Sequence, residues 1–568
     1  MFKLENILIK MIEFDETKRE ERVKALRLRE EEDLASVLAS HHGVSYLDLS
    51  AHPINIDALR LIKESEARDS QIAIFNNVNK KIDIAVISPK NEKTILAIEK
   101  LREQGYDPTI YMTSHQSLEK VWSRYKDLSY SFETKSGSLD ISNDEIIQLV
   151  SSVSSISDIK KMVENVLGQK KTFRTSRILE IILAGSIALK ASDIHIEPED
   201  EKIRLRYRLD GVLTDVLYFD KNTFNLIVSR IKLISELKIN VTTIAQDGRF
   251  SIKLSGQEIE VRTSLLPGPN GESVVLRVLN PNAIGVDIDK LNIHPKLLSI
   301  LKKEIAKPNG MILTTGPTGS GKTTTLYAFL KKIYSPEIKI ITIENPIEYH
   351  LEGIVQTQTE PSKGYTFAEG LRSALRQDPD VIMVGEIRDS ETATTAINAS
   401  LTGHLVFSTL HTNNAAGSFP RLLDLGVNYK VIASALNISI AQRLVRTLCS
   451  VCKKEVLLEG EDKKLVERIV SNISDKSYLS EIQMEKIWHS VGCEKCNNTG
   501  YKGRMGVHEA ILMDSKIEEA ILKNPSERDI REASKEQGLL NLSQDGILKV
   551  LQGHTSIDEL ERVVDLSQ

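Results

Sequence analysis

Long apolar runs and an excess of one charge sign are both missing from this chain of 568 residues. No stretch approaches the ~18 consecutive apolar residues that span a bilayer, and the start, Met1–Asn6, lacks the basic and apolar regions of a signal peptide. The 74 Lys and Arg residues are nearly balanced by 79 Asp and Glu, and the formal net charge is −5, so no basic field indicates a nucleic-acid partner. We therefore expect a cytoplasmic protein that binds no nucleic acid.

Cysteine is also scarce. The four cysteines form two C-x-x-C pairs, Cys449 with Cys452 and Cys493 with Cys496. A small number of cysteines that all lie in such pairs is typical of metal ligands in a reducing compartment. The 40 residues between the pairs exceed the usual spacing of a zinc ribbon, so a helical insertion fits there. Two alternatives stay open, a pair of redox dithiols or buried unliganded cysteines. We predict Zn²⁺ in a structural role, because four protein ligands leave no open position for catalysis.

The chain is too long for one hydrophobic core, and its composition divides it into four segments. Residues 1–125 begin with a charged helical stretch and continue as a small α/β module, and residues 126–165 contain a linker rich in Ser, Gly, Asp and Asn. Residues 166–282 indicate a second α/β module, with helices expected near 176–190 and 223–237. Residues 283–568 hold the motifs described next and are helical toward the carboxyl end.

A phosphate-binding loop is predicted at Gly316–Thr323, which fits the pattern G-x-x-x-x-G-K-[ST]. Apolar Met311–Thr315 predicts a strand before it, and the spacing after it predicts a helix, so the loop lies where the motif requires. Backbone N–H groups and the helix dipole would hold a triphosphate, Lys322 would reach its β- and γ-phosphates, and Thr323 would bind Mg²⁺. The predicted nucleotide-binding residues are Gly316, Pro317, Thr318, Gly319, Ser320, Gly321, Lys322, Thr323 and Thr324.

Polar side chains follow three further predicted strands. Glu344 ends the strand 339–344 and is followed by Glu348, Glu386 ends the strand 380–386, and His404 and His411 bound a third strand. Open parallel sheets bind ligands at the carboxyl ends of their strands, so we expect these acids and both imidazoles at one edge beside the loop. Two carboxylates beside a phosphate loop imply Mg²⁺ and an activated water.

Arginines mark the strands of the second module. Alternation along residues 203–209 puts three of them on one face of a strand, and three more follow on or beside later strands. For each one, an arginine that acts on a nucleotide and an arginine that lines the wet face of a sheet are both open interpretations. The six are Arg204, Arg206, Arg208, Arg249, Arg262 and Arg277.

Together these motifs resemble the signature set of the type II secretion and type IV pilus assembly ATPases. The matching segments are 316–323, 344–348, 371–380, 385–389 and 403–412, with 191–198, 208–212, 246–249 and 261–264 upstream and the cysteine pairs and 500–504 downstream. The resemblance covers residues 170–568 and, more loosely, 35–125. It implies an α/β fold: a RecA-like P-loop core with a zinc-bearing helical insertion, preceded by a PAS-like α/β module and an amino-terminal docking module.

The resemblance also implies roles for individual residues. Glu386 would support Mg²⁺ and its water shell, and Glu348 would orient or deprotonate the attacking water. His404 and His411 would sense the γ-phosphate. Arg262 and Arg277 would be delivered by the second module to neutralise charge that develops during phosphoryl transfer. One position departs from the family, because Asn345 stands where the acidic box usually has Asp, and this removes a charge beside the metal site.

By this resemblance we expect a Mg²⁺-dependent ATPase that uses ATP, carries Zn²⁺ and assembles as a homo-oligomer, a hexameric ring. It would associate peripherally with the inner face of the cytoplasmic membrane and drive an inner-membrane platform protein that assembles pilin-like subunits. Two rivals stay open: a conjugation-type or DNA-translocating ATPase, and a nucleotide-gated scaffold that hydrolyses ATP weakly. The shared motor motifs do not distinguish pilus assembly from protein secretion.

Overall fold

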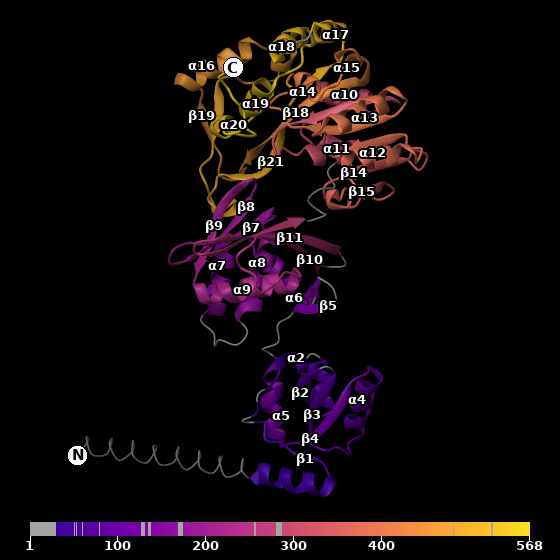
Figure 1. The fold of residues 1–568 in the computed structure, drawn as a ribbon. Coiled ribbons are helices and arrows are strands. Elements are labelled where there is room, and N and C mark those ends of the chain that lie inside the picture. Colours follow the sequence, from indigo (N-terminus) through magenta and orange to yellow (C-terminus); the bar gives the residue numbers. More distant parts are fainter. Residues whose placement is uncertain are drawn as a thin grey trace, which may run out of the picture. The chain divides into compact units, whose positions relative to one another are not determined.

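The computed structural model describes residues 30–49, 52, 54–59, 61–78, 80–125, 131–134, 138–141, 143–167, 174–254, 257–279, 287–480, 482–523 and 526–567 (Figure 1). The chain divides into two compact units. The first comprises Met1–Phe132 and Val166–Arg177, and the second comprises Glu133–Asn165 and Ile178–Gln568.

The first unit is a small α/β module that follows a helix at residues 30–42. Its four-stranded sheet has the order β1 (Ser45–Tyr46), β4 (Asp107–Met112), β3 (Lys81–Val86), β2 (Ile72–Val78). The short helices α2 (Ile56–Leu59) and α3 (Glu64–Asp69) and the longer α4 (Glu92–Glu103) and α5 (His115–Trp122) contribute side chains to the core of this sheet. Trp122 closes the core by donating its indole N–H to the carbonyl of Ile72 at 2.9 Å.

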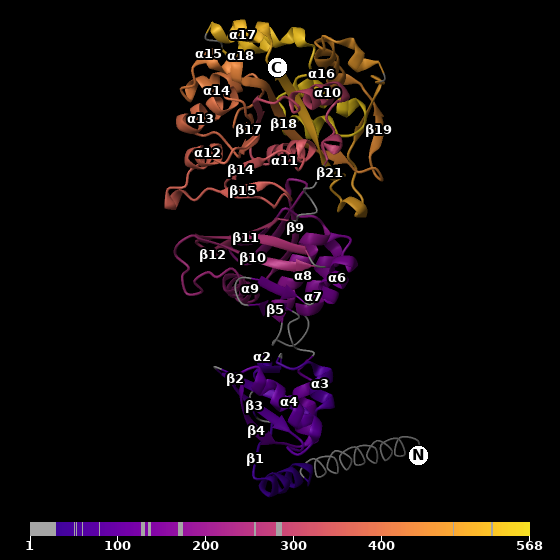
Figure 2. The ribbon, with the colours of Figure 1, turned by 90° about the vertical axis from the view of Figure 1, so that its right-hand side faces the viewer.

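An eight-stranded sheet of the order β5-β6-β10-β11-β12-β7-β8-β9 belongs to the second unit, except for the first two residues of β5. Its strands are β5 (Ser131–Thr134), β6 (Ser138–Ile141), β7 (Asp193–Pro198), β8 (Ile203–Leu209), β9 (Val212–Phe219), β10 (Gln246–Leu254), β11 (Gln257–Gly268) and β12 (Gly271–Leu279). Helices α7 (Ile156–Leu167), α8 (Arg174–Ala188) and α9 (Lys221–Ile234) lie along one face of it, and α6 (Asn143–Ser152) precedes them (Figures 1 and 2).

The arginine strand folds as the alternation predicts. Ile203, Leu205 and Tyr207 of β8 are buried against the helices, so the arginines between them lie on the opposite face of the sheet. On the helix side, Lys232 of α9 and Glu272 form an ion pair of 2.7 Å that is almost fully buried. The apolar face therefore holds the module together while the other face is free to carry charge.

The second sheet of this unit has seven strands in the order β15-β14-β16-β17-β13-β18-β21. The strands are β13 (Gly310–Thr315), β14 (Ile340–Glu344), β15 (Val355–Gln358), β16 (Val381–Val384), β17 (Leu405–Leu410), β18 (Leu436–Leu448) and β21 (Tyr501–Leu512). All neighbours are parallel except β18 and β21. The strands β13, β14, β16 and β17 are buried along their whole length, as expected of parallel strands covered on both faces.

Helices cover both faces of this sheet. Met311 and Leu313 of β13 pack into one core together with α12 (Phe367–Leu375), α13 (Ser390–Leu401), α14 (Ser418–Asp424) and α15 (Tyr429–Ala435). Ile312 between them packs into another core together with α10 (Pro295–Glu304) and α11 (Lys322–Ile333). The predicted α/β class is thus confirmed, with a phosphate-loop core at its centre.

The carboxyl-terminal part adds a small hairpin and several helices. Strands β19 (Lys454–Leu457) and β20 (Lys486–His489) pair antiparallel and enclose α16 (Gly460–Ser471), which is the helical insertion expected between the cysteine pairs. Helices α17 (Ser515–Leu522), α18 (Glu527–Ser534), α19 (Leu542–Leu551) and α20 (Ile557–Glu561) follow. Among the described residues, no helix combines the length and apolar character that crossing a membrane requires.

Candidate active site

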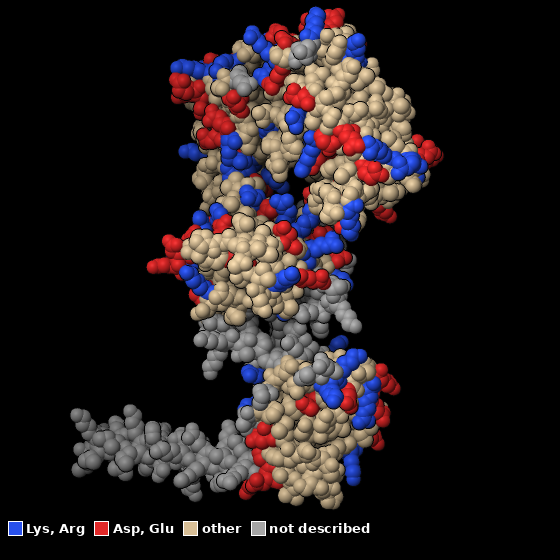
Figure 3. All heavy atoms as spheres, viewed as in Figure 1, with Lys and Arg blue, Asp and Glu red and all other residues tan. Residues whose placement is uncertain are grey.

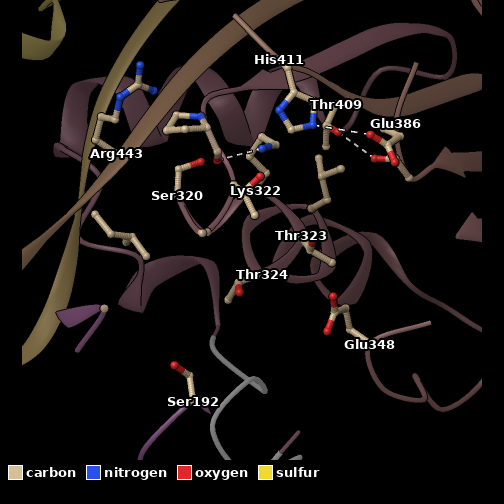
Figure 4. A pocket seen from close by; sticks show the side chains of 18 of the residues that line it. Ser192, Ser320, Lys322, Thr323, Thr324, Glu348, Glu386, Thr409, His411 and Arg443 are labelled. Atoms are coloured by element: carbon tan, nitrogen blue, oxygen red, sulfur yellow. Dashed lines mark hydrogen bonds and ion pairs between the residues drawn. The ribbon is translucent and has the colours of Figure 1, made fainter. Parts of the chain in front are cut away.

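The phosphate loop joins the end of β13 to the start of α11, as the motif predicts (Figure 4). Gly316, Gly319 and Gly321 have φ angles of 146°, 79° and 89°, which residues with a side chain rarely adopt. Gly316 is also crowded, because a Cβ there would lie 2.6 Å from the carbonyl oxygen of Gln442 and 2.7 Å from Ser320 Oγ. The loop therefore needs glycine both for its turns and for its close contact with β18.

Lys322 is the first residue of α11 and folds over the loop. Its Nζ donates to the carbonyls of Gly316 at 2.8 Å and Pro317 at 3.0 Å. Burial lowers the pKa of Lys322 to about 8, although the negative charge of Glu386 opposes this shift. Thr323 and Thr324 follow on the first helical turn and line the same cavity, so the structure brings the predicted phosphate-binding side chains together (Figure 4).

Polar contacts fix the neighbouring strands against the loop. Thr315, the last residue of β13, donates its hydroxyl to the carbonyl of Leu410 at 3.0 Å and accepts the backbone N–H of Thr412 at 2.9 Å. On the other side, Thr325 of α11 donates to Gln442 Oε1 of β18 at 2.7 Å. The carboxyl end of β17 and the middle of β18 are thus held beside the phosphate loop.

Glu386 lies at the carboxyl end of β16, where the sequence predicts it. Its carboxylate pairs with Arg388 Nε at 2.6 Å and lies 3.5 Å from His411 Nε2. The segment before it is anchored, because the N–H of Gly385 donates to Ile343 at 2.8 Å and its carbonyl accepts from Thr409 Oγ1 at 2.7 Å. Figure 4 shows Glu386 and His411 facing each other on one side of Lys322.

The loop after β14 carries the other acids. Glu344 is buried and accepts from Tyr327, from Thr342 at 2.6 Å and from Gln356 at 3.1 Å. Burial raises the pKa of Glu344, and these hydrogen bonds only partly offset that shift. Glu348 is only partly buried and lines the cavity, and the exposed Asn345 lines it as well. Glu348 is therefore the acid of this loop with access to a bound water.

The two histidines lie at opposite ends of β17, so the prediction that both sit beside the loop is wrong for His404. The carbonyl of His404 accepts from Gly310 at the start of β13, whereas His411 follows the strand's carboxyl end and lines the cavity. Six strand residues separate them, which is about 20 Å of extended chain. Burial, reinforced by the charge of Lys322, lowers the pKa of His411, so this imidazole is neutral near pH 7.

The cavity around the loop has a volume of about 930 Å³ and is also lined by the arginine-bearing sheet. Arg277 contributes to it and binds Asp193 Oδ1 at 3.0 Å, and Arg208 binds the other oxygen of the same carboxylate at 3.1 Å. Burial would raise the pKa of Asp193, but the hydrogen bonds from Arg277 and Ser192 outweigh it and the pKa is lowered. The carboxylate is thus charged and binds two arginines that line the cavity.

Arg262 lies in an adjoining cavity of about 790 Å³ rather than in the first one. Its Nη2 donates to the carbonyl of Ile347 at 2.8 Å, next to Glu348, which lines both cavities. Arg277 also lines both. The structure therefore places the two predicted arginines beside the Glu348 loop.

Comparison with known proteins identifies the family. A family model described as Type II/IV secretion system protein matches residues 169–562. The chain belongs to this family. Type II secretion system protein E of Dickeya dadantii is 39% identical over 517 residues, covering 91% of this chain and 99% of that relative. The type IV pilus assembly ATPase PilB of Myxococcus xanthus is 34% identical over 537 residues, covering 94% and 91%.

A solved structure supports the fold of this secretion-family ATPase. The Legionella pneumophila ATPase DotB superposes with a TM-score of 0.50 at 21% identity, covering 70% of this chain and 97% of that one. At this identity the likeness bears on the fold alone. The family membership and the ATPase relatives establish that the chain is an ATPase of the secretion and pilus-assembly class.

The tetracysteine cluster of this secretion-family ATPase has the geometry of a metal site. The four sulfurs lie within 4.8 Å of one another, and three of the sulfur–sulfur distances are 3.7, 3.8 and 3.9 Å. Zn²⁺ with Zn–S bonds of about 2.3 Å separates tetrahedral ligands by about 3.8 Å, whereas a disulfide requires about 2.05 Å. Backbone N–H groups of Cys493 and Gly500 point at Cys496 Sγ from 3.2 and 3.3 Å. The cluster therefore fits zinc in the predicted structural role.

Several residues of the site are not predicted by the sequence. Arg443 of β18 is 8% exposed and lines the cavity, where its guanidinium donates to the carbonyls of Gln442 and Asn413. Leu444 follows it, and Arg562 and Val563 reach the same cavity from beyond α20. Arg443 and Leu444 reach the cavity because β18 pairs with β13, and the sequence pattern around the loop does not reveal this pairing.

Proposed function

We propose that this protein hydrolyses ATP with Mg²⁺ and uses the energy to assemble pilin or pseudopilin subunits in a type IV pilus or a type II secretion machine. The observation that carries the proposal is the convergence of Lys322, Glu348, Glu386 and His411 on one cavity around a glycine-shaped phosphate loop. Relatives named for both machines support the two possible settings.

The geometry supports a part in phosphoryl transfer for each of these side chains. Lys322 already bends over the loop, so a small movement of its Nζ from the Gly316 and Pro317 carbonyls would bring it to the β- and γ-phosphates. Glu348 would orient the attacking water or accept its proton, because it is the accessible carboxylate of its loop. His411, neutral and beside Glu386, would donate a hydrogen bond to the γ-phosphate.

The residues present fit Mg²⁺. Thr323 and Glu386 offer a hydroxyl and a carboxylate to the same cavity, and these oxygen donors are the ones this hard cation prefers. Bound Mg²⁺ would neutralise charge on the phosphate oxygens. The pairing of Glu386 with Arg388 keeps the carboxylate in place. Asn345 is exposed and amide-bearing, so it adds no charge to this donor set.

Arg262 and Arg277 would supply positive charge to the transition state. Both belong to the eight-stranded sheet and lie beside the Glu348 loop, so movement of this sheet would change their distance from the phosphates. Arginine contributions of this kind are worth about 10³–10⁵ in rate. Hydrolysis would thus be coupled to motion, which is what a motor needs.

We further propose a hexameric homo-oligomer at the inner face of the cytoplasmic membrane, recruited by an inner-membrane platform protein. Peripheral attachment through partners would suit a chain whose described helices do not cross a membrane. No nucleic-acid partner is proposed, because acidic and basic side chains are interspersed on the face shown in Figure 3 and the formal net charge is −5. Light scattering with and without nucleotide tests the hexamer.

Steady-state phosphate release from ATP tests the enzymatic part. Lys322→Ala and Glu348→Gln should each lower kcat by at least about a hundredfold. Glu352→Gln is the matched control, since this exposed acid lies in the same loop but outside the cavity lining. Equal rates in the unaltered protein, Lys322→Ala and Glu348→Gln would refute the proposed motor. The nucleotide-gated scaffold that hydrolyses ATP weakly would then be the remaining function.

A further inference from the structure

The cavity extends to both sides of the phosphate loop. In the sheet order β16-β17-β13-β18, β16, which ends two residues before Glu386, lies on one side of β13, and β18, which carries Leu444, lies on the other. Figure 4 likewise shows Arg443 and Glu386 on opposite sides of the loop. The proposed function puts the γ-phosphate beside Glu386, Glu348 and His411, so the rest of the nucleotide would extend toward β18.

Three side chains close that second end. Leu444, Arg562 and Val563 all line the cavity. Leu444 flanks the start of α11, because a Cβ on Gly321 would lie 3.4 Å from its Cδ1. Leu444 and Val563 are partly buried aliphatic residues, which suit the flat apolar faces of a base rather than a phosphate.

Arg562 is held in position before any ligand arrives. Its Nε and Nη2 donate to the two carboxylate oxygens of Glu559 at 3.0 and 2.7 Å. The side chain of Glu559 is fully buried and is itself fixed by Arg446, whose backbone N–H and Nε both donate to it at 2.9 Å. The bonds with Glu559 raise the pKa of Arg562, so the guanidinium stays charged. This pre-positioning reduces the entropy lost on binding.

The segment that carries Arg562 is also anchored to β18. Thr555 Oγ1 donates to the carbonyl of Arg446 at 2.9 Å, and Ser556 Oγ lies 2.7 Å from the hydroxyl of Tyr501. Leu560 of α20 is fully buried in the core. The position of Arg562 in the cavity is therefore set by the fold and not by a loose chain end.

We propose that Arg562, with Leu444 and Val563, binds the nucleoside half of the nucleotide. This inference rests on the proposed function. Two nitrogens of the guanidinium bind Glu559, while Nη1 has no hydrogen-bond partner among the residues that the structure describes. A guanidinium presents five N–H donors in a rigid plane, so Nη1 can donate to an acceptor of the base or the ribose while the plane packs on the base.

Calorimetric titration of the full chain with ADP and with inorganic triphosphate tests the proposal. Arg562→Ala should weaken ADP binding by about tenfold to a hundredfold and leave the affinity for inorganic triphosphate unchanged. Val563→Ala should weaken ADP binding by a smaller factor, again without changing triphosphate binding. Arg468→Ala is the matched control, because Arg468 donates to the carbonyl of Leu566 near the same chain end but does not line the cavity.

Several results of these titrations would overturn the proposed role of Arg562. Equal weakening of ADP and triphosphate in Arg562→Ala would make Arg562 a phosphate ligand and overturn the proposal, as would unchanged ADP binding. The same loss in Arg468→Ala would show a loosened chain end instead and would equally overturn it. If Arg562→Ala does not fold, as judged by its melting temperature, Val563→Ala decides alone. Absence of ADP and triphosphate binding in the unaltered protein would refute the proposed function itself.

Discussion

Gly316→Ala should damage the site far more than the neighbouring change Gly319→Ala. The added methyl at Gly316 would lie 2.6 Å from the backbone oxygen of Gln442, and a carbon–oxygen contact needs about 3.3 Å. The loop must therefore retreat by roughly 0.7 Å, since the oxygen belongs to β18 and accepts from Arg443 Nη1 at 3.0 Å. A misplacement near 1 Å costs about a hundredfold in rate, so kcat/KM for ATP should fall by about this factor.

Gly319→Ala is the control because it changes the backbone without a clash. Gly319 has a φ of 79°, but no atom lies within 4 Å of the position that an alanine methyl would occupy. Only the left-handed strain of about 1–2 kcal/mol remains, which limits the loss to about tenfold. Phosphate release at varied ATP gives kcat/KM for both variants, and thermal melting shows that each is folded. Equal losses in the two variants, or near-normal turnover in Gly316→Ala, would refute the steric argument.

Three more outcomes are expected. Affinity for ADP should fall about tenfold from pH 7 to pH 9, because only protonated Lys322 attracts phosphate and its pKa is about 8. Calorimetry in two buffers should show that the protein takes up protons when ADP binds. Cys493→Ser should lose the one Zn²⁺ per chain that elemental analysis is expected to find in the unaltered protein, whereas redox dithiols would hold none. Lys232→Met should cost about 3–5 kcal/mol in urea unfolding by stranding the buried Glu272 carboxylate, and adding Glu272→Leu should restore most of it.

Local patterns carry most of the predictions that the structure confirms. The loop at Gly316–Thr323 and the helix after it follow from neighbouring residues, and the alternation of β8 follows from a period of two. The tetracysteine cluster is predictable because ligand type and pair spacing survive any arrangement of the insertion between them. These features need no knowledge of which strand lies beside which.

The errors and omissions arise from tertiary placement. The sequence suggests His404 for the site because it bounds the same strand as His411, yet the length of β17 puts the two at opposite edges of the sheet. Arg443 and Arg562 escape prediction because they lie far along the chain from Lys322. Arg443 reaches the cavity through the pairing of β13 with β18, and Arg562 reaches it because α20 is bound to β18. No local signal distinguishes them from the many other arginines of the sequence.

The thirteen residues of β18 connect two places that share no side chain. Arg443 lines the cavity around the phosphate loop, and Cys449 directly follows the end of the strand, about 20 Å of extended chain away. Any coupling between a nucleotide in the cavity and Zn²⁺ at the cysteines would pass along this strand and would be reciprocal: whatever factor zinc adds to ADP affinity, ADP adds to zinc affinity. Removal of zinc would then change the affinity for nucleotide by that same factor, although the residues that line the nucleotide cavity stay the same.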